Sequence, residues 1–217
     1  MCAETTDTTR AQPMTGDMTG SADWNVFYAE RSTIWSGEPN AQLVAEATGL
    51  SPGSALDVGC GEGADAVWLA QHGWDVTAVD VSDVALKRAR EHAATLGCEI
   101  EFVHLDVVAT PPQPKTYDLV SAQFFQLEDP PRSQAMRSLG ASVALGGHLL
   151  VVGHYPAGHA GANHPERLFT LDEIIGLFSP DDWAVVTSET RERTAMHHGE
   201  ITDLVDGVVL LRRTGQA

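Results

Sequence analysis

Residues 56–70 read LDVGCGEGADAVWLA, an apolar run that breaks into three glycines and continues as an amphipathic segment. This order predicts a strand, a tight turn and a helix. Gly59, Gly61 and Gly63 have no side chain, so the backbone of the turn can approach a ligand closely. The free N–H groups at the start of the helix point outward from the same place. The stretch therefore predicts a ligand site between a strand and a helix of an α/β fold.

Strands and helices alternate around this stretch. Strand-like runs occupy residues 54–59, 74–81, 99–106, 117–124 and 147–154. Helical patterns at residues 64–73 and 82–97 lie between them, and each ends in glycine. The alternation predicts right-handed crossovers and a mainly parallel, doubly wound sheet with helices on both faces.

The C-terminal part of the sequence follows a different pattern. Thr170 and Glu173 have the spacing of a capping box, which predicts the start of a helix. Two strand-like runs, residues 182–193 and 201–213, then follow with a short link between them. Consecutive strands joined in this way predict an antiparallel pair that completes one edge of the sheet.

The length of 217 residues suits one domain with a sizeable core. Residues 1–22 are rich in Thr, Ser and Gly and offer little apolar surface to bury, which predicts a disordered tail. Residues 23–217 are expected to form the single domain. Within it, residues 24–40 are dense in aromatic side chains and precede a helical segment at residues 41–50. Such density is typical of core packing or of a lid over a ligand.

The charge and the cysteines limit the partners and the compartment. The formal net charge is -17, the pI is about 4.7, and Lys and Arg are scattered, so nucleic acid and anionic membranes are not expected partners. Cys2, Cys60 and Cys98 are odd in number and lack metal-ligand spacing. No apolar run approaches membrane-spanning length, and the N-terminus has no signal pattern. These features predict a cytoplasmic protein with reduced thiols.

Acidic side chains end three successive predicted strands, at Asp57, Asp80 and Asp106. Asp57 and Glu62 would oppose a pyrophosphate, but they suit a ligand with an ammonium group. A carboxylate at Asp80 can accept both hydroxyls of a ribose, and Asp106 is placed to bind an adenine amino group. No Lys-Ser or Lys-Thr pair follows the glycines, which excludes a Walker-type phosphate loop. Together the acids favour a cofactor with an amino-acid end, a ribose and an adenine.

Four successive segments, LDVGCGEG, VTAVDVS, EFVHLD and YDLVSAQF, resemble motifs of the class I S-adenosylmethionine-dependent methyltransferases. The resemblance covers residues 41–213. It implies a Rossmann-like sheet of seven strands, with the last strand antiparallel, and S-adenosyl-L-methionine as cofactor. Residues 24–40, 60–82 and 149–154 look more narrowly like the tellurite-resistance and thiopurine methyltransferase branch. In that branch the N-terminal segment covers the cofactor, so residues 23–52 are expected to form a lid and a helix.

The resemblance also implies where the cofactor binds. Its methionyl end is expected at Asp57, Gly59, Cys60, Gly61 and Gly63. The ribose is expected at Asp80, and the adenine at Val81, Asp106 and Val107. The residues expected near the sulfonium are Ser121, Ala122 and Gln123, and those expected in the lid are Tyr28, Arg31 and Trp35.

Methyl transfer is an in-line displacement that a site can promote largely by alignment and by excluding water. A thiolate or a metalloid oxyanion needs no strong base, but a cationic or protonatable side chain would help to hold it. The candidate catalytic residues are His154 at the end of the fifth predicted strand, Arg31 in the lid, and Gln123. Further candidates for holding an acceptor are Arg167, Arg191, Arg193, His197 and His198.

Two other methyltransferase types fit less well. EDPPR at residues 128–132 departs from the D-P-P-Y signature of base methylation because Arg132 replaces the aromatic residue, and it predicts a turn before a helix with Pro131 in its first turn. Glu128 and Asp129 alone do not make a divalent-metal site, so no metal is expected.

The sequence thus predicts a methyltransferase that acts on a small-molecule nucleophile, such as a thiol or a metalloid oxyanion like tellurite or selenite. One alternative is a small-metabolite O- or N-methyltransferase of the phenol or quinone type. Another is a sensor that binds S-adenosylmethionine without catalysis. The glycine spacing also suits a nicotinamide-dependent reductase, but Asp57 weakens that interpretation.

Overall fold

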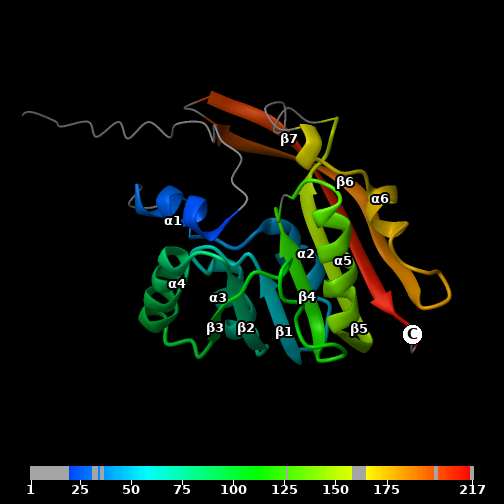
Figure 1. Ribbon diagram of the computed structural model, residues 1–217, viewed down its shortest axis with the longest axis horizontal. Coiled ribbons are helices and arrows are strands. Elements are labelled where there is room, and N and C mark those ends of the chain that lie inside the picture. The colour runs from blue at the N-terminus through cyan, green and yellow to red at the C-terminus, as the bar shows by residue number, and fades with distance from the viewer. Residues whose placement is uncertain are drawn as a thin grey trace, which may run out of the picture.

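The computed structural model describes residues 20–30, 34, 37–125, 127–157, 165–197 and 200–215. In this part of the chain seven strands form one sheet, in the order β3-β2-β1-β4-β5-β7-β6 (Figure 1). The strands are β1 (Ser54–Val58), β2 (Asp75–Asp80), β3 (Glu101–His104), β4 (Tyr117–Gln123), β5 (Val143–His154), β6 (Trp183–His197) and β7 (Glu200–Arg213). β1 to β5 are parallel, whereas β7 runs antiparallel to β5 and β6. The predicted fold, with its final antiparallel strand, is confirmed.

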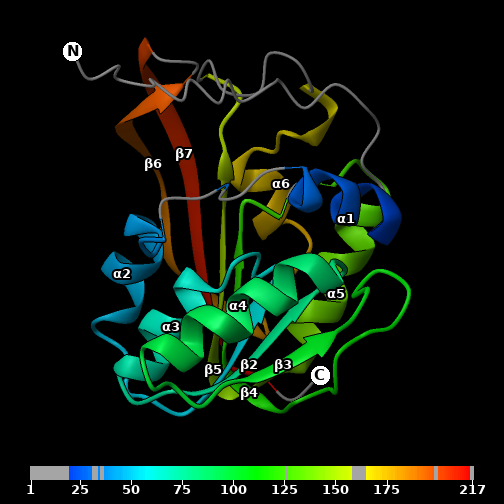
Figure 2. The ribbon, with the colours of Figure 1, turned by 90° about the vertical axis from the view of Figure 1, so that its left-hand side faces the viewer.

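Helices cover both faces of the sheet (Figure 2). One face carries α2 (Ala41–Ala47), α3 (Ala64–Gln71) and α4 (Asp83–Thr95). The other carries α5 (Pro131–Ser142) and α6 (Leu171–Ile175), preceded by the short 3-10 turn η1 (Pro165–Arg167). The predicted capping box at Thr170 starts α6, and Pro131 occupies the first turn of α5 as predicted. None of the described helices is long and apolar enough to cross a membrane.

The sheet separates two apolar cores. Leu69 of α3 and Leu86 of α4 are fully buried in the core on one face. Leu139 of α5 and Ile174 of α6 are buried in the core on the other face. Burying each such side chain stabilises the fold by roughly 2 kcal/mol. Because side chains alternate between the faces along each strand, the register decides which residues share a face at the end of the sheet.

Some elements differ from the sequence prediction. The first part of the aromatic segment folds as a helix, α1 (Ser21–Ala29), which lies beside α4 at the carboxyl end of the parallel strands (Figure 1). It begins inside the predicted tail, whose residues 1–19 lie outside the described residues. β5 begins at Val143, before the predicted start at residue 147. Residues 105–116, which join β3 to β4, contain no helix, and three prolines in this link disfavour one.

Candidate active site

The carboxyl ends of the parallel strands bring polar side chains to one edge of the sheet. Alternation along the strands places Asp57 of β1, Asp80 of β2, Gln123 of β4 and His154 of β5 on the face that α2, α3 and α4 cover. β7 adds Asp206, which is the register partner of His154. The first four residues are among those expected at the site from the sequence, whereas Asp206 is not.

Asp57 is more deeply buried than Asp80, the neighbouring acid of this edge. It is 2% exposed, and its Oδ2 atom has no hydrogen-bond partner among the described residues. Burial raises the pKa of this carboxyl well above its usual value, and the carboxyls of Asp65 and Asp80 raise it further. The backbone N–H of Ala66, in the first turn of α3, lowers the pKa by a smaller amount. A cation beside Asp57 would compensate for its burial.

Asp80 connects β2 to the glycine turn. Its Oδ2 atom accepts a hydrogen bond of 2.9 Å from the N–H of Gly61, and its Oδ1 atom accepts one of 2.8 Å from the N–H of Ser82. Burial raises the pKa of Asp80, although these two hydrogen bonds act in the opposite direction. The bonds fix the carboxylate at the edge, and its remaining lone pairs can accept bonds from hydroxyl groups.

The glycine turn adopts a conformation that favours glycine at each of its three predicted positions. The φ angles of Gly59, Gly61 and Gly63 are +68°, +53° and +84°. A Cβ atom on Gly63 would lie only 2.9 Å from the Cβ of Ala89 in α4. Gly63 therefore allows α3 and α4 to pack closely, which sets the direction of the first turn of α3.

The other predicted cofactor residues of the sheet lie near the same edge. The side chains of Cys60 and Val107 are buried in the two cores, so at Cys60 only the backbone can meet a ligand. Val81 is half-buried directly after β2. Asp106 is exposed, and its Oδ1 atom accepts bonds of 2.9 and 3.3 Å from two backbone N–H groups that follow it. The Oδ1 atom of Asp106 thus stabilises the backbone turn that follows this residue.

Ser121 and Gln123 lie on β4 beside Asp57, and Ser121 is the register partner of Asp57. The Nε2 atom of Gln123 donates a hydrogen bond of 3.0 Å to the Ser121 hydroxyl. Its Oε1 atom has no partner among the described residues, although the residue is only 8% exposed. A buried carbonyl oxygen without a donor destabilises the fold unless a ligand or a water supplies one.

Charged and aromatic side chains gather where β5 ends, in a group that we call the His154 cluster: His154, Asp206, Arg193 and Phe124. The Nδ1 atom of His154 lies 3.6 Å from Oδ1 of Asp206, whose side chain is fully buried. Oδ2 of Asp206 accepts a hydrogen bond of 2.6 Å from Nε of Arg193. Burial alone would raise the pKa of Asp206, but His154 and Arg193 together hold it below its usual value. Asp206 therefore carries its negative charge.

Phe124 completes the His154 cluster. Its ring centroid lies 4.8 Å from that of the His154 imidazole and 5.3 Å from Cζ of Arg193. Its φ angle is +52°, in the left-handed region that an aromatic residue rarely adopts. Phe124 follows Gln123 directly, so it stands between the end of β4 and His154.

Hydrogen bonds fasten α1 to the edge of the sheet. The Oδ1 atom of Asn25 accepts a bond of 2.8 Å from the Ser82 hydroxyl and one of 3.2 Å from the N–H of Val84. Val84 lies in the first turn of α4, where backbone N–H groups have no partner within the helix. Asn25 thus caps α4 from outside, a role that no local sequence pattern predicts.

Arg88 makes the second attachment of α1. Its guanidinium donates to the carbonyl of Tyr28 at 2.7 Å and to Glu62 of the glycine turn at 2.8 Å. Glu62, expected to face a ligand, is therefore paired with a cation of the protein. The side chain of Tyr28 is 3% exposed, and Arg31 and Trp35 lie outside the described residues.

The remaining candidate cations lie close to acidic side chains of the protein or fall outside the described residues. Arg191 binds Glu46, Glu189 and Gln42, which fastens β6 to α2. Arg167 lies 3.8 Å from Glu128, at the other face of the sheet. The side chain of His197 and the whole of His198 lie outside the described residues.

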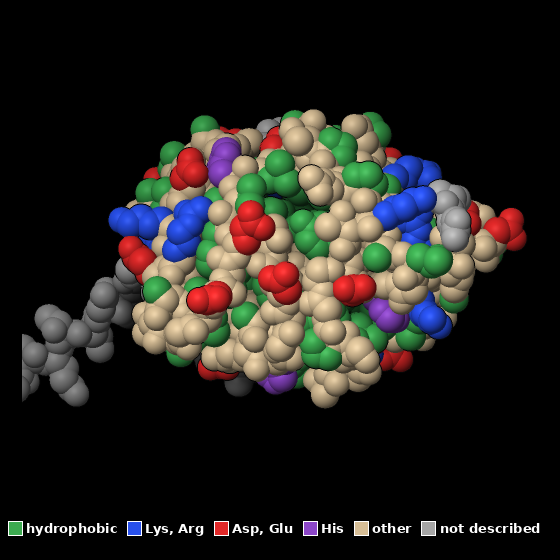
Figure 3. Space-filling view, turned by 90° about the horizontal axis from the view of Figure 1, so that it is seen from below, with side chains coloured by type: hydrophobic (Ala, Val, Ile, Leu, Met, Phe, Trp, Pro, Cys, Tyr) green, Lys and Arg blue, Asp and Glu red, His purple; other side chains and the backbone are tan. Residues whose placement is uncertain are grey.

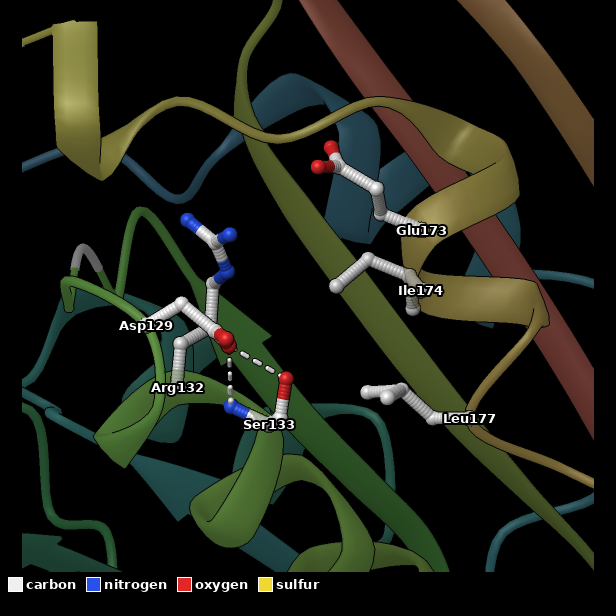
Figure 4. A pocket seen from close by; sticks show the side chains of 6 residues that line it. All are labelled: Asp129, Arg132, Ser133, Glu173, Ile174 and Leu177. Atoms are coloured by element: carbon white, nitrogen blue, oxygen red, sulfur yellow. Dashed lines mark hydrogen bonds between the residues drawn. The ribbon is translucent and has the colours of Figure 1, made fainter.

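A cavity of about 210 Å³ opens between α5 and α6 (Figure 4). Its lining residues are Asp129, Arg132, Ser133, Glu173, Ile174 and Leu177. These helices cover the face opposite to Asp57, so the cavity is separate from the site.

Figure 3 shows the end of the molecule away from the site, where acidic, basic and apolar side chains are interspersed. Among the described residues, no three His, Cys, Asp or Glu side chains are grouped to hold a metal ion.

Part of the chain is similar to known methyltransferases. Residues 55–147 match a family described as a methyltransferase domain. Over 108 residues the chain is 33% identical to a ubiquinone biosynthesis O-methyltransferase of Aliivibrio fischeri, a stretch that covers 49% of this chain and 46% of that protein. The chain thus matches about half the length of such relatives.

Solved structures share the whole fold at lower identity. TehB from Haemophilus influenzae has a TM-score of 0.70 and 18% identity, over 88% of this chain and 67% of that chain. The N-methyltransferase NodS from Bradyrhizobium japonicum, in complex with S-adenosyl-L-homocysteine, has a TM-score of 0.69 and 18% identity, over 91% of this chain and all of that chain. At these identities the likeness concerns the fold alone.

The fold, the glycine turn and the matched family define a Rossmann-like methyltransferase domain. Residues 55–147 match the methyltransferase domain family, and the findings together support a class I S-adenosylmethionine-dependent methyltransferase with S-adenosylmethionine as its cofactor. The residues present fit this cofactor, because the buried Oδ2 atom of Asp57, which no other described residue binds, suits a positively charged ligand.

Proposed function

We propose that this protein binds S-adenosylmethionine over the glycine turn and transfers its methyl group to a small-molecule nucleophile. The observation that carries the proposal is the buried Asp57 carboxyl, whose Oδ2 atom has no partner in the described part of the chain and lies beside three glycines of left-handed conformation. A buried carboxylate without a cation is costly, and this cofactor carries a sulfonium and an ammonium group.

The strand ends suggest which residues hold each part of the cofactor. Asp57 and the backbone of residues 59–63 would bind the amino-acid end, and Asp80 would accept the ribose hydroxyls. Val81, Asp106 and Val107 would border the adenine. Ser121 and Gln123 would lie closest to the reacting centre, with Tyr28, Arg31 and Trp35 in the covering segment. The bonds of α1 to Ser82 and Arg88 support a cover that starts from α1.

The bound cofactor supplies an activated methyl group on a sulfonium sulfur. The contribution of the chain is to align the acceptor with that group and to exclude water. The hydrogen bond from Gln123 to Ser121 fixes the amide of Gln123 and directs its free Oε1 atom toward a bound molecule. Phe124 adds an apolar wall next to this atom.

Two acceptor classes are supported by different observations. The sequence pattern of the chain favours a thiol or a metalloid oxyanion such as tellurite. Likeness in sequence to a ubiquinone biosynthesis O-methyltransferase supports a phenol-type hydroxyl instead. Both classes are small molecules, as the proposal requires.

Calorimetric titration with S-adenosylhomocysteine tests the cofactor site. We expect binding by the wild-type protein, loss of affinity in Asp57→Ala, and no change in the control Asp75→Ala, because Asp75 is exposed at the other end of the sheet. A folded wild-type protein that binds neither the cofactor nor its product contradicts the proposal.

Release of S-adenosylhomocysteine then tests catalysis. The acceptor panel consists of aryl thiols, tellurite, selenite, phenols and a hydroquinone. Turnover with any of them supports the proposed function, whereas tight binding with no turnover supports the sensor alternative. We also infer a cytoplasmic location, which the unpaired state of Cys60 and Cys98 supports.

A further inference from the structure

We propose that His154 is the general base of this site and that the acceptor arrives as a neutral aromatic hydroxyl compound. This inference rests on the proposed function and names the substrate class of the same site. It follows from the geometry and the charge balance of the His154 cluster.

The geometry assigns different roles to the two imidazole nitrogens. Nδ1 of His154 faces Oδ1 of Asp206 at 3.6 Å, and neither atom has another partner among the described residues. Asp206 is a buried anion, so it favours the tautomer with the proton on Nδ1. Nε2 then has a free lone pair, which can accept a proton from a bound molecule. The His154 side chain is 23% exposed, so a small molecule can reach it.

The charges of the cluster disfavour an anionic acceptor. Among the described residues, the arginines of this edge are already paired: Arg88 with Glu62, Arg191 with Glu46 and Glu189, and Arg193 with Asp206. Within the described part of the chain, this pairing leaves no surplus cation at the edge to hold an oxyanion. The chain itself carries a formal charge of -17, which repels anions during approach. A neutral acceptor that loses its proton only inside the site avoids this repulsion.

The acidity of the acceptor group favours a phenol over a thiol. An imidazole has an ordinary pKa of about 6.5, and a phenol such as the tyrosine side chain has one of about 10. This gap is small enough for proton transfer to help the reaction, whereas a thiol at about 8.5 is already partly ionised near neutral pH. The aromatic ring of Phe124, 4.8 Å from His154, offers a surface on which an aromatic acceptor can stack.

The backbone of Phe124 supports a functional role for this surface. Its φ angle of +52° is an unfavourable backbone conformation for this residue, so contacts with the surrounding structure must hold it in place. The conformation places the ring against both His154 and Arg193. Residues held in such conformations gather at ligand sites, where the strain positions a side chain.

The proposed step is balanced within the site. A lone pair of the hydroxyl oxygen forms the new bond to the methyl carbon. The electron pair of the breaking carbon–sulfur bond returns to sulfur, which loses its positive charge. The hydroxyl proton moves to Nε2 of His154, and the resulting imidazolium is stabilised by Asp206.

The first test measures proton transfer without methyl transfer. 4-Nitrophenol is titrated into protein saturated with S-adenosylhomocysteine, and the absorbance of its phenolate is followed against pH. Among the residues that the structure describes, the charged groups that face His154 are Asp206 from β7 and Arg193 from β6. We expect the wild-type protein to shift ionisation of the bound probe to lower pH by about one unit, and His154→Gln to abolish the shift.

The second test compares methyl transfer to phenols of decreasing acidity, from 4-nitrophenol to 4-methoxyphenol. We expect His154→Gln to lose about 10²- to 10⁴-fold in rate with 4-methoxyphenol and far less with the nitrophenol, which is largely ionised on its own. His148→Gln is the matched control, because His148 lies on the same face of β5, six residues before His154, and should behave as wild type.

The outcomes separate this inference from the proposed function. An equal loss across the phenol series would indicate a structural role for His154 and overturn the inference. A wild-type protein that methylates aryl thiols but no phenol, or that leaves the ionisation of the probe unchanged, also overturns it while the proposed function stands. Failure to bind S-adenosylhomocysteine at all overturns the proposed function instead.

Discussion

Glu62 in the glycine turn and Arg88 in α4 form an ion pair of 2.8 Å at the carboxyl edge of the sheet. The same guanidinium donates a hydrogen bond to the carbonyl of Tyr28, at the end of α1. Glu62 also accepts a bond of 3.3 Å from the N–H of Ile34, beyond α1. One arginine and one glutamate thus connect the proposed cover of the site to the turn beneath it.

Replacing Arg88 should loosen this connection. Arg88→Met keeps the aliphatic stem but removes both hydrogen bonds, so we expect a loss of about 1 kcal/mol in the free energy of unfolding. Affinity for S-adenosylhomocysteine should fall several-fold, because α1 is then held less firmly at the edge. Thermal unfolding and calorimetric binding measure the two effects. Arg90→Met, an exposed position on the same helix, is the control, and equal loss of affinity in both variants would contradict the role of Arg88.

Asn25 provides a second attachment that can be tested by stability. Asn25→Ala removes the acceptor for the Ser82 hydroxyl and the N–H of Val84, and we expect it to cost about 1 kcal/mol, as other helix caps do. Asn25→Asp retains an acceptor oxygen and adds a negative charge near the start of α4, so it should remain close to wild type. Identical thermal unfolding of the two variants would argue against capping.

Asp57 should lower the stability of the protein without cofactor. The pKa of its carboxyl is raised in the folded state, so the folded protein binds this proton more tightly than the unfolded chain does. The stabilisation from the bound proton is complete below the ordinary pKa of 3.8 and is lost as the pH rises through the pKa of the folded protein. Asp57→Asn removes this dependence. At about pH 8 we expect the free energy of unfolding of the variant to exceed that of the wild type by on the order of 1 kcal/mol. This difference should shrink toward about pH 5.

The same substitution should weaken cofactor binding, because asparagine has no charge to offset a sulfonium or an ammonium group. Denaturant unfolding across this pH range measures the stability, and calorimetry measures the affinity. Asp75→Asn, at the opposite end of the sheet, controls for a general effect of removing one acid from an acidic chain. A variant that is both less stable and unchanged in affinity would show that Asp57 serves the fold instead.

The local pattern of the sequence was sufficient to predict the glycine turn and the edge of the sheet. Apolar runs that end in an acid identify Asp57 and Asp80, and parallel strands bring their ends to one edge. Glycine spacing identifies Gly63, whose φ angle and close contact with α4 favour glycine. These features depend on neighbouring residues, so a short stretch of sequence contains the information.

Features that depend on distant contacts could not be predicted in this way. α1 buries only Tyr28 and has no apolar stripe, so its helix depends on the bonds to Ser82 and Arg88. The partnership of His154 and Asp206 exists because β7 inserts between β5 and β6. Nothing in the local pattern of either strand specifies that order.

Gly63 and Gly97 offer a matched pair for testing how tightly the site is packed. Both have positive φ angles, +84° and +68°, but a Cβ on Gly97 meets no atom within 4 Å. Gly97→Ala should therefore cost only the backbone strain, about 1 to 2 kcal/mol. Gly63→Ala adds a contact of 2.9 Å between Cβ atoms on two helices, which must move apart, so we expect about 2 to 4 kcal/mol.

The two variants should also differ in function. Moving α3 displaces the first turn that faces Asp57, so Gly63→Ala should weaken binding of S-adenosylhomocysteine, while Gly97→Ala should leave it unchanged. Denaturant unfolding measures the first effect and calorimetry the second. If both alanines cost the same free energy and neither alters binding, the helices can separate without disturbing the turn, and the close packing at Gly63 does not position the cofactor site.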